Sequence, residues 1–85
     1  MSATTTKIYT FILVLNGVTE LTPEMAETVF AACDDSSPWS SEGVVSIGFD
    51  READSLGDAV GSAIRDIEKA GFAVARVEVE GPAKG

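Results

Sequence analysis

Lys-Ile-Tyr-Thr-Phe-Ile-Leu-Val-Leu, at residues 7–15, is the stretch that decides the fold. β-Branched and aromatic residues dominate it, and Asn16-Gly17 follows with residues suited to a turn, so the stretch predicts a β-strand. Successive side chains of a strand point to opposite faces, and both faces of this one are apolar. Such a strand is typical of the middle of a sheet, so we expect residues 7–15 to lie centrally.

Two helices are predicted further along the chain. Thr22-Pro23-Glu24 combines a capping residue, a proline whose missing N–H does no harm in the first turn, and an acid near the positive end of the helix dipole. We expect this helix to end near Cys33. Ser55 and Asp58 have the spacing of a capping box and open a second helix, which Gly71 is expected to stop.

Three further strands complete the prediction. The polar, turn-rich segment 34–43 is long enough to include a short, irregular edge strand around Ser36–Ser40. Val44–Asp50 has Val45, Ile47 and Phe49 on one side, which we expect to face the core. The last strand is Phe72–Glu80, which alternates until Gly81-Pro82 ends it.

This order of elements predicts the α+β class and, within it, a ferredoxin-like βαββαβ sandwich. Right-handed crossovers put both helices on one face of an antiparallel sheet and leave the other face open. We expect a single domain over residues 7–80, with disordered tails at residues 1–6 and 81–85. The strand and helix periodicities aim one set of side chains at its core: Phe11, Leu13, Phe30, Ile47, Phe49, Leu56, Ile64 and Ile67.

Composition limits the partners and the compartment. The net charge is −8 and the six basic residues are scattered, so we expect no direct nucleic-acid binding by this chain. The polar N-terminus does not resemble a signal peptide, and the longest apolar run, Phe11–Leu15, is too short to span a bilayer. We therefore expect no membrane partner. A single cysteine forms no internal disulfide, which favours a cytoplasmic protein.

The residue types present do not predict an enzyme. The sequence contains no histidine, which excludes a Ser-His-Asp triad and histidine metal sites. Cys33 lies on the apolar stripe of the first helix, so we expect a buried structural thiol. The acids at 34, 35 and 42 and at 50, 52 and 54 lack a calcium-loop spacing, and the glycines do not form a phosphate-binding turn. We therefore expect no metal, no cofactor and no catalytic residue.

Four segments carry a resemblance to a known family: Ala32-Cys33-Asp34-Asp35, Gly43-Val44-Val45, Phe49–Ala53 and Ala63–Ala70. The chain resembles the N-terminal domain of small bacterial proteins described as helix-turn-helix or putative DNA-binding proteins of unknown function. Those proteins continue after the last strand into a helix-turn-helix segment, whereas this chain ends at Gly81-Pro82-Ala83-Lys84-Gly85. The resemblance therefore implies only the companion domain of a bacterial regulator, for dimerisation, partner binding or sensing.

The function favoured by these observations is a non-catalytic protein-interaction or dimerisation domain, most simply a homodimer. Two alternatives stay open: a small-ligand-sensing domain, and an acidic antitoxin or immunity-type inhibitor that binds a basic partner. Trp39 next to Pro38 is either an interface residue or a side chain that folds back onto the edge of its own core. The candidate interface, on the sheet face that the helices leave open and in the Trp39 loop, consists of Ile8, Ile12, Val14, Trp39, Val44, Val74 and Arg76.

Overall fold

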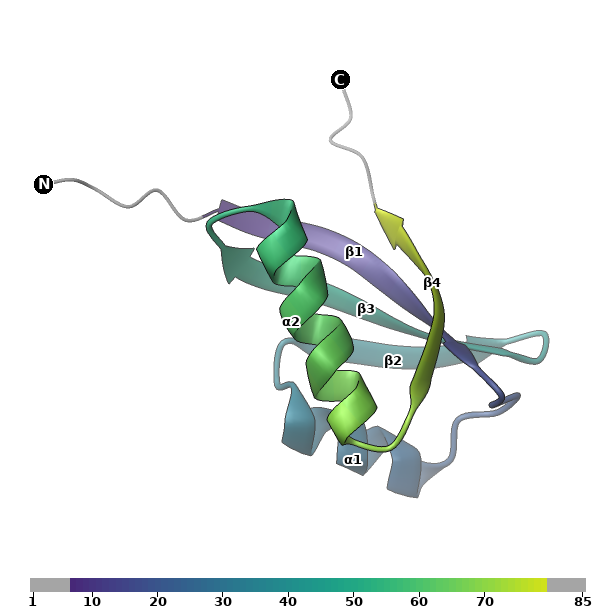
Figure 1. Cartoon of the computed structure of the whole chain (residues 1–85). Helices are drawn as coiled ribbons and strands as arrows, with labels where there is room; N and C mark the ends of the chain where they lie inside the picture. Colours follow the sequence, from purple (N-terminus) through teal and green to yellow (C-terminus); the bar gives the residue numbers. More distant parts are fainter. Residues whose placement is uncertain (1–6, 80–85) are drawn as a thin grey trace, which may run out of the picture.

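Four strands and two helices make up the part of the chain that the structure describes, residues 7–79 of a computed structural model (Figure 1). The two predicted tails and Glu80 lie outside these residues. In chain order the elements are β1 (Lys7–Asn16), α1 (Pro23–Ala32), β2 (Ser36–Ser41), β3 (Val44–Ala53), α2 (Leu56–Lys69) and β4 (Ala73–Val79).

The strands form one antiparallel sheet in the order β2-β3-β1-β4. β1 lies in the middle, as its two apolar faces predict, and pairs with β3 from Lys7 opposite Ala53 to Val14 opposite Ser46. The predicted edge strand near residues 36–40 is confirmed as β2. β3 runs three residues beyond the predicted Asp50, because β1 offers it pairing partners as far as Lys7.

Both helices begin where the sequence places them. Thr22 caps α1, its Oγ1 accepting a hydrogen bond from the N–H of Met25 at 3.2 Å, and Pro23 occupies the first turn. Ser55 caps α2 in the same way, accepting from the N–H of Asp58 at 3.1 Å. Gly71 follows α2 with a φ of +101°, a left-handed conformation that glycine adopts without a steric penalty.

The helices cover the sheet unequally, which differs from the expected pair of helices laid across one face. α2 crosses in front of the strands and contacts β1, β3 and β4, whereas α1 lies beside the edge strand β2 and contacts only β2 and α2 (Figure 1). α1 therefore buries a single residue, Val29. Phe30, expected in the core, is 50% exposed because the side of α1 that carries it has no element opposite it within residues 7–79.

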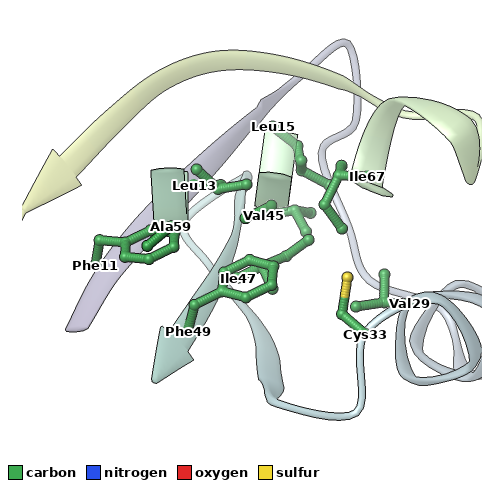
Figure 2. Close-up of a cluster of buried hydrophobic side chains, with 11 residues drawn as sticks. Phe11, Leu13, Leu15, Val29, Cys33, Val45, Ile47, Phe49, Ala59 and Ile67 are labelled. Carbon is green, nitrogen blue, oxygen red and sulfur yellow. The ribbon is translucent and has the colours of Figure 1, made fainter. Parts of the chain in front are cut away.

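The core lies between α2, α1 and one face of the sheet (Figure 2). Five of the eight expected core residues are buried, and Leu56 and Ile64 are half-buried at its margin. Ala59 and Ala63 face the sheet and are fully buried, so small side chains allow α2 to approach the strands closely. The buried set is Phe11, Leu13, Leu15, Val29, Cys33, Val45, Ile47, Phe49, Ala59, Ala63 and Ile67.

Two isoleucines of α2 test this packing. We expect Ile67→Ala to lower the free energy of unfolding by about 2–5 kcal/mol, because it opens a cavity in the closed core. Ile64→Ala removes the same atoms from the half-buried margin, so its loss should be clearly smaller. Urea denaturation of both variants measures the difference, and equal losses would contradict the burial described for α2.

Candidate functional site

The sheet face turned away from α2 is the candidate interaction surface, here called the outer face. The side chains of β1 and β3 alternate, so the residues next to the buried Phe11, Leu13, Ile47 and Phe49 point to the outer face. Within residues 7–79, neither helix packs on it. The outer face consists of Ile8, Thr10, Ile12, Val14, Ser37, Trp39, Ser41, Val44, Ser46, Gly48, Asp50, Glu52, Arg76 and Glu78.

Strand register aligns these residues in two rows across all four strands. The first, the tryptophan row, runs from Trp39 on β2 through Ser46 on β3 and Val14 on β1 to Arg76 on β4. The second, the glycine row, contains Ser37, Gly48, Ile12 and Glu78 in the same strand order. In both rows β3 contributes a small residue and β1 a β-branched one.

Trp39 lies over β3 and leaves one side of its indole exposed. A Cβ atom built on Gly48 would lie 3.2 Å from Cζ3 of the indole, so the ring reaches across β3 and the absence of a side chain at Gly48 makes room for it. Trp39 is nevertheless 41% exposed. It therefore packs on the outer face and not on the edge of the core, which was the alternative that the sequence left open.

Five of the other predicted interface residues are also on the outer face. Ile8 and Val44 are exposed, Ile12 is half-buried, and Val14 is buried although no helix covers it. Arg76 is exposed at the edge strand, where its guanidinium forms an ion pair with Glu78 at 2.9 Å. The structure thus brings Ile8, Ile12, Val14, Trp39, Val44 and Arg76 to one face.

Val74 is the exception, and its predicted position on the outer face is wrong. The register between β1 and β4 shifts between Val14 and Leu15: Val14 pairs with Arg76, but Leu15 pairs with Val74. Ala75 is therefore an extra residue, a β-bulge that interrupts the alternation. Val74 turns to the helix side and packs against the core, while Arg76 stays on the outer face.

A second polar group, around Arg51, was not predicted from the sequence. Arg51 donates to both carboxylate oxygens of Asp35, at 2.8 and 2.9 Å, and to Asp66 at 3.1 Å and Ser62 at 3.0 Å. Its guanidinium also lies 5.3 Å from the centre of the Phe49 ring, and only 14% of its side chain is exposed. The cluster joins the start of β2 to β3 and α2.

The electrostatics of this cluster are those of a structural ion pair. The hydrogen bonds from Arg51 lower the pKa of Asp35, and the hydrogen bond to Asp35 raises the pKa of Arg51. Burial raises the pKa of the nearby Cys33 thiol, which lies 3.8 Å from a carboxylate oxygen of Asp66. A raised pKa opposes formation of the thiolate, so Cys33 has the properties of the buried structural thiol expected from the sequence.

A shallow depression between α1 and α2 is lined by Thr28, Ala31, Ala32, Asp66, Lys69 and Ala70. Among residues 7–79, cysteine and acidic side chains do not gather in a group that could hold a metal ion. In the same part of the chain, neither helix has the length and apolar character needed to cross a membrane.

Comparisons with protein-family models, curated proteins and solved structures found no match for this chain. The resemblance to the N-terminal domain of bacterial helix-turn-helix proteins therefore stays a prediction.

The ion pair predicts how stability depends on pH. Arg51→Met should lower the free energy of unfolding by about 1.5–3 kcal/mol at neutral pH, because it leaves Asp35 and Asp66 without their cation. Since the folded protein lowers the pKa of Asp35, this stabilisation is present above the ordinary pKa of the carboxyl group and is lost as the pH falls through the lowered value. Denaturant unfolding of wild type and variant should therefore converge on acidification.

The exposed ion pair of Arg76 and Glu78 gives the matched control. At a protein concentration below the dissociation constant of the proposed dimer, Arg76→Met should change the free energy of unfolding by less than about 1 kcal/mol, since both partners are largely in solvent. An equal loss in both variants would mean that the Arg51 cluster is no stronger than a surface pair.

The position of Trp39 can be tested through its fluorescence, because it is the only tryptophan in the chain. We expect Gly48→Val to displace the indole from β3, since the new side chain would occupy the space beneath the ring. The emission maximum should move to longer wavelength. Gly57→Val is the control, since a Cβ there meets only the Ser55 hydroxyl at 3.9 Å. Unchanged emission in Gly48→Val would contradict the contact between Trp39 and β3.

Proposed function

We propose that this chain is a non-catalytic protein-interaction domain that forms a symmetric homodimer through its outer face. The single observation that carries the proposal is the exposed indole of Trp39 on a sheet face that neither helix covers. Tryptophan is among the residues most enriched at the centres of protein interfaces. Val44, 41% exposed, extends the apolar surface along β3, and Ile8, 68% exposed, adds apolar area beyond the Thr10–Asp50 pair.

The size of the outer face suits a dimer of small chains. With strands about 4.8 Å apart and a rise of about 3.3 Å per residue, the four strands cover roughly 500 Å² in projection. Side chains roughen this surface, so the accessible area approaches the value of about 800 Å² per partner that is usual for specific complexes. In an isolated chain this apolar surface would remain exposed to solvent, and exposed apolar patches of this size mark interaction sites.

Charge explains why contact would be made here and not elsewhere. Each chain carries a net charge of −8, so two copies repel each other at long range. The middle of the outer face is uncharged, since Trp39, Ser46 and Val14 fill the first three positions of the tryptophan row. Arg76 adds a base at the edge. The acids of this face, Asp50, Glu52 and Glu78, lie outside its middle, so a second acidic chain meets the least repulsion in the middle.

We also propose that the fold is a ferredoxin-like sandwich. The element order β-α-β-β-α-β, with β1 and β3 in the middle of an antiparallel sheet, supports a ferredoxin-like sandwich in which α1 is displaced to the β2 edge. In a sandwich of this kind the sheet keeps one open face. A companion domain that dimerises a bacterial regulator would use that face.

Analytical ultracentrifugation tests the proposal. Wild-type protein at tens of micromolar should sediment as a dimer, and Val44→Asp and Ile12→Asp should sediment as monomers, because each places a carboxylate within the apolar contact. Phe30→Asp is the matched control: Phe30 is 50% exposed, similar to Val44, but lies on α1 away from the outer face. Circular dichroism confirms that each variant is folded.

The salt dependence separates self-association from capture of a basic protein. Raising NaCl from about 0.05 M to about 0.5 M should tighten a homodimer of two acidic chains, because salt screens their repulsion. Binding of a basic partner by an acidic inhibitor would weaken over the same range. A wild type that stays monomeric at tens of micromolar, or a dimer that only Phe30→Asp dissociates, would overturn the proposal.

A further inference from the structure

We infer that a second copy of this chain pairs with the free edge of β4, in an antiparallel contact that sets Val77 opposite Val77 of that copy. β4 is the last strand in the order β2-β3-β1-β4, so within residues 7–79 one of its sides pairs with no strand. The contact joins two four-stranded sheets into one continuous sheet. It is separate from the outer face, so it adds a second contact between copies and does not depend on the proposed dimer.

The direction of the backbone groups begins with a hydrogen bond of β3. In an antiparallel sheet the N–H and C=O of one residue point to the same side, and those of the next residue point to the other side. The N–H of Asp50 donates to the carbonyl of Asp35, 3.3 Å away on the β2 side. Phe49 therefore directs its backbone groups to β1. Pro38, opposite Ile47, agrees with this alternation, because its position in the ladder needs no N–H toward β3.

The same alternation continues across β1 to β4. Phe49 pairs with Phe11, so Phe11 directs its backbone groups to β3 and Ile12 directs its own to β4. Ile12 pairs with Glu78, whose groups therefore point back to β1. Val77, the neighbour of Glu78, directs its N–H and C=O to the free edge. These are the groups that an added antiparallel strand binds.

Charge selects the register of the contact. When a two-fold axis passes between Val77 and its copy, these two residues exchange both backbone hydrogen bonds. The same register sets Arg76 opposite Glu78 of the second copy, as a non-hydrogen-bonded pair, in which side chains lie closest. A register centred on Arg76 would place two guanidinium groups opposite each other, and like charges in that position are destabilising.

The existing ion pair of β4 suits this register. Arg76 and Glu78 of one chain are 2.9 Å apart, and both side chains are exposed. In the proposed contact each guanidinium lies between its own Glu78 and that of the second copy, so four charges alternate in sign. Such a network counteracts locally the repulsion between two chains that each carry a net charge of −8.

The helix side of β4 adds a small apolar contact. Val77 and Val79 pair with the buried Leu13 and Phe11, so their side chains also lie on the helix side. Val79 is 49% exposed. In the proposed register Val77 meets its own copy, and Val79 lies opposite Ala75 of the second copy. The bulge at Ala75 ends the regular pairing, so we expect a short contact that is weaker than the outer-face dimer.

The opposite edge of the sheet, β2, does not suit such pairing. The alternation places the nitrogen of Pro38 on the free side of β2, where proline has no N–H to donate. α1 also lies beside this edge and contacts β2 (Figure 1). Because β4 is used by both copies and β2 is blocked, edge pairing stops at two chains and does not continue into a fibre.

Nuclear magnetic resonance of the full-length Val44→Asp variant tests the contact, because this variant removes the outer-face dimer and leaves β4 unchanged. Its concentration is raised from about 0.05 mM to about 1 mM, the range in which weak complexes form. Hydrogen exchange of the Val77 amide should slow about two-fold, the factor for a dissociation constant of about 1 mM. The amides of Arg76 and Glu78, which point to β1, should be protected equally at both concentrations.

Charge reversal on the same background tests the register. Arg76→Glu should abolish the concentration dependence at Val77, since four carboxylates then lie together. Arg76→Glu/Glu78→Arg should restore it, because each base again lies opposite an acid. Arg65→Glu makes the same change in net charge on α2 and should leave the concentration dependence in place. The dispersion of the spectra shows that each variant is folded.

The outcomes separate this contact from the outer-face dimer. Exchange at Val77 that does not depend on concentration overturns the edge contact and leaves the proposed function standing. Concentration dependence that the double variant fails to restore, or that Arg65→Glu also abolishes, overturns the register. A wild type that is monomeric at tens of micromolar overturns the outer-face dimer alone, because the edge contact is measured at millimolar concentration.

Discussion

The pairing of β1 with β3 is the constraint on which the rest of the structure depends. Phe11 and Phe49 are opposite each other in this ladder, and their rings stack with centroids 5.3 Å apart. Side chains alternate along a strand, so a register slip of one residue would turn Phe11 and Leu13 to the outer face and Ile12 and Val14 to the helices. The aromatic pair and the buried aliphatic residues beside it oppose that slip.

Both faces of the sheet take their properties from this register. On the helix side it presents a closed apolar surface to α2, which approaches closely through Ala59 and Ala63. α1 contributes little beyond Val29, and the connection that follows it is held by polar contacts: Ser36 donates to the carbonyl of Cys33, and Arg51 binds Asp35. A small core is thus supplemented by an ion pair where helix coverage ends.

On the outer face the same register produces a surface of a different kind. It sets small residues of β3 beside β-branched residues of β1 and places an aromatic residue and a base at the two edges. Gly48 is the key position, since a Cβ there would lie only 3.2 Å from the indole and would force the ring to shift from its place on β3. This is the face that we propose as the functional surface, because it combines exposed apolar area with an uncharged middle.

The sequence by itself determined the elements whose signals are local. Capping by Thr22 and Ser55 depends on residues three positions away, and the central place of β1 follows from the apolar residues on both of its faces. The sequence therefore predicted the α+β class and the antiparallel sheet, and six of its seven predicted interface residues lie on the outer face.

Only the tertiary structure decided the features that depend on distant partners. The bulge that turns Val74 inward arises from pairing with β1, and the position of α1 that exposes Phe30 depends on how much of the sheet α2 already covers. Arg51 meets Asp35 and Asp66 across 16 and 15 positions of the chain. Such contacts produce no periodic pattern in the sequence. The partners are brought together by the packing of separate elements and not by the conformation of neighbouring residues.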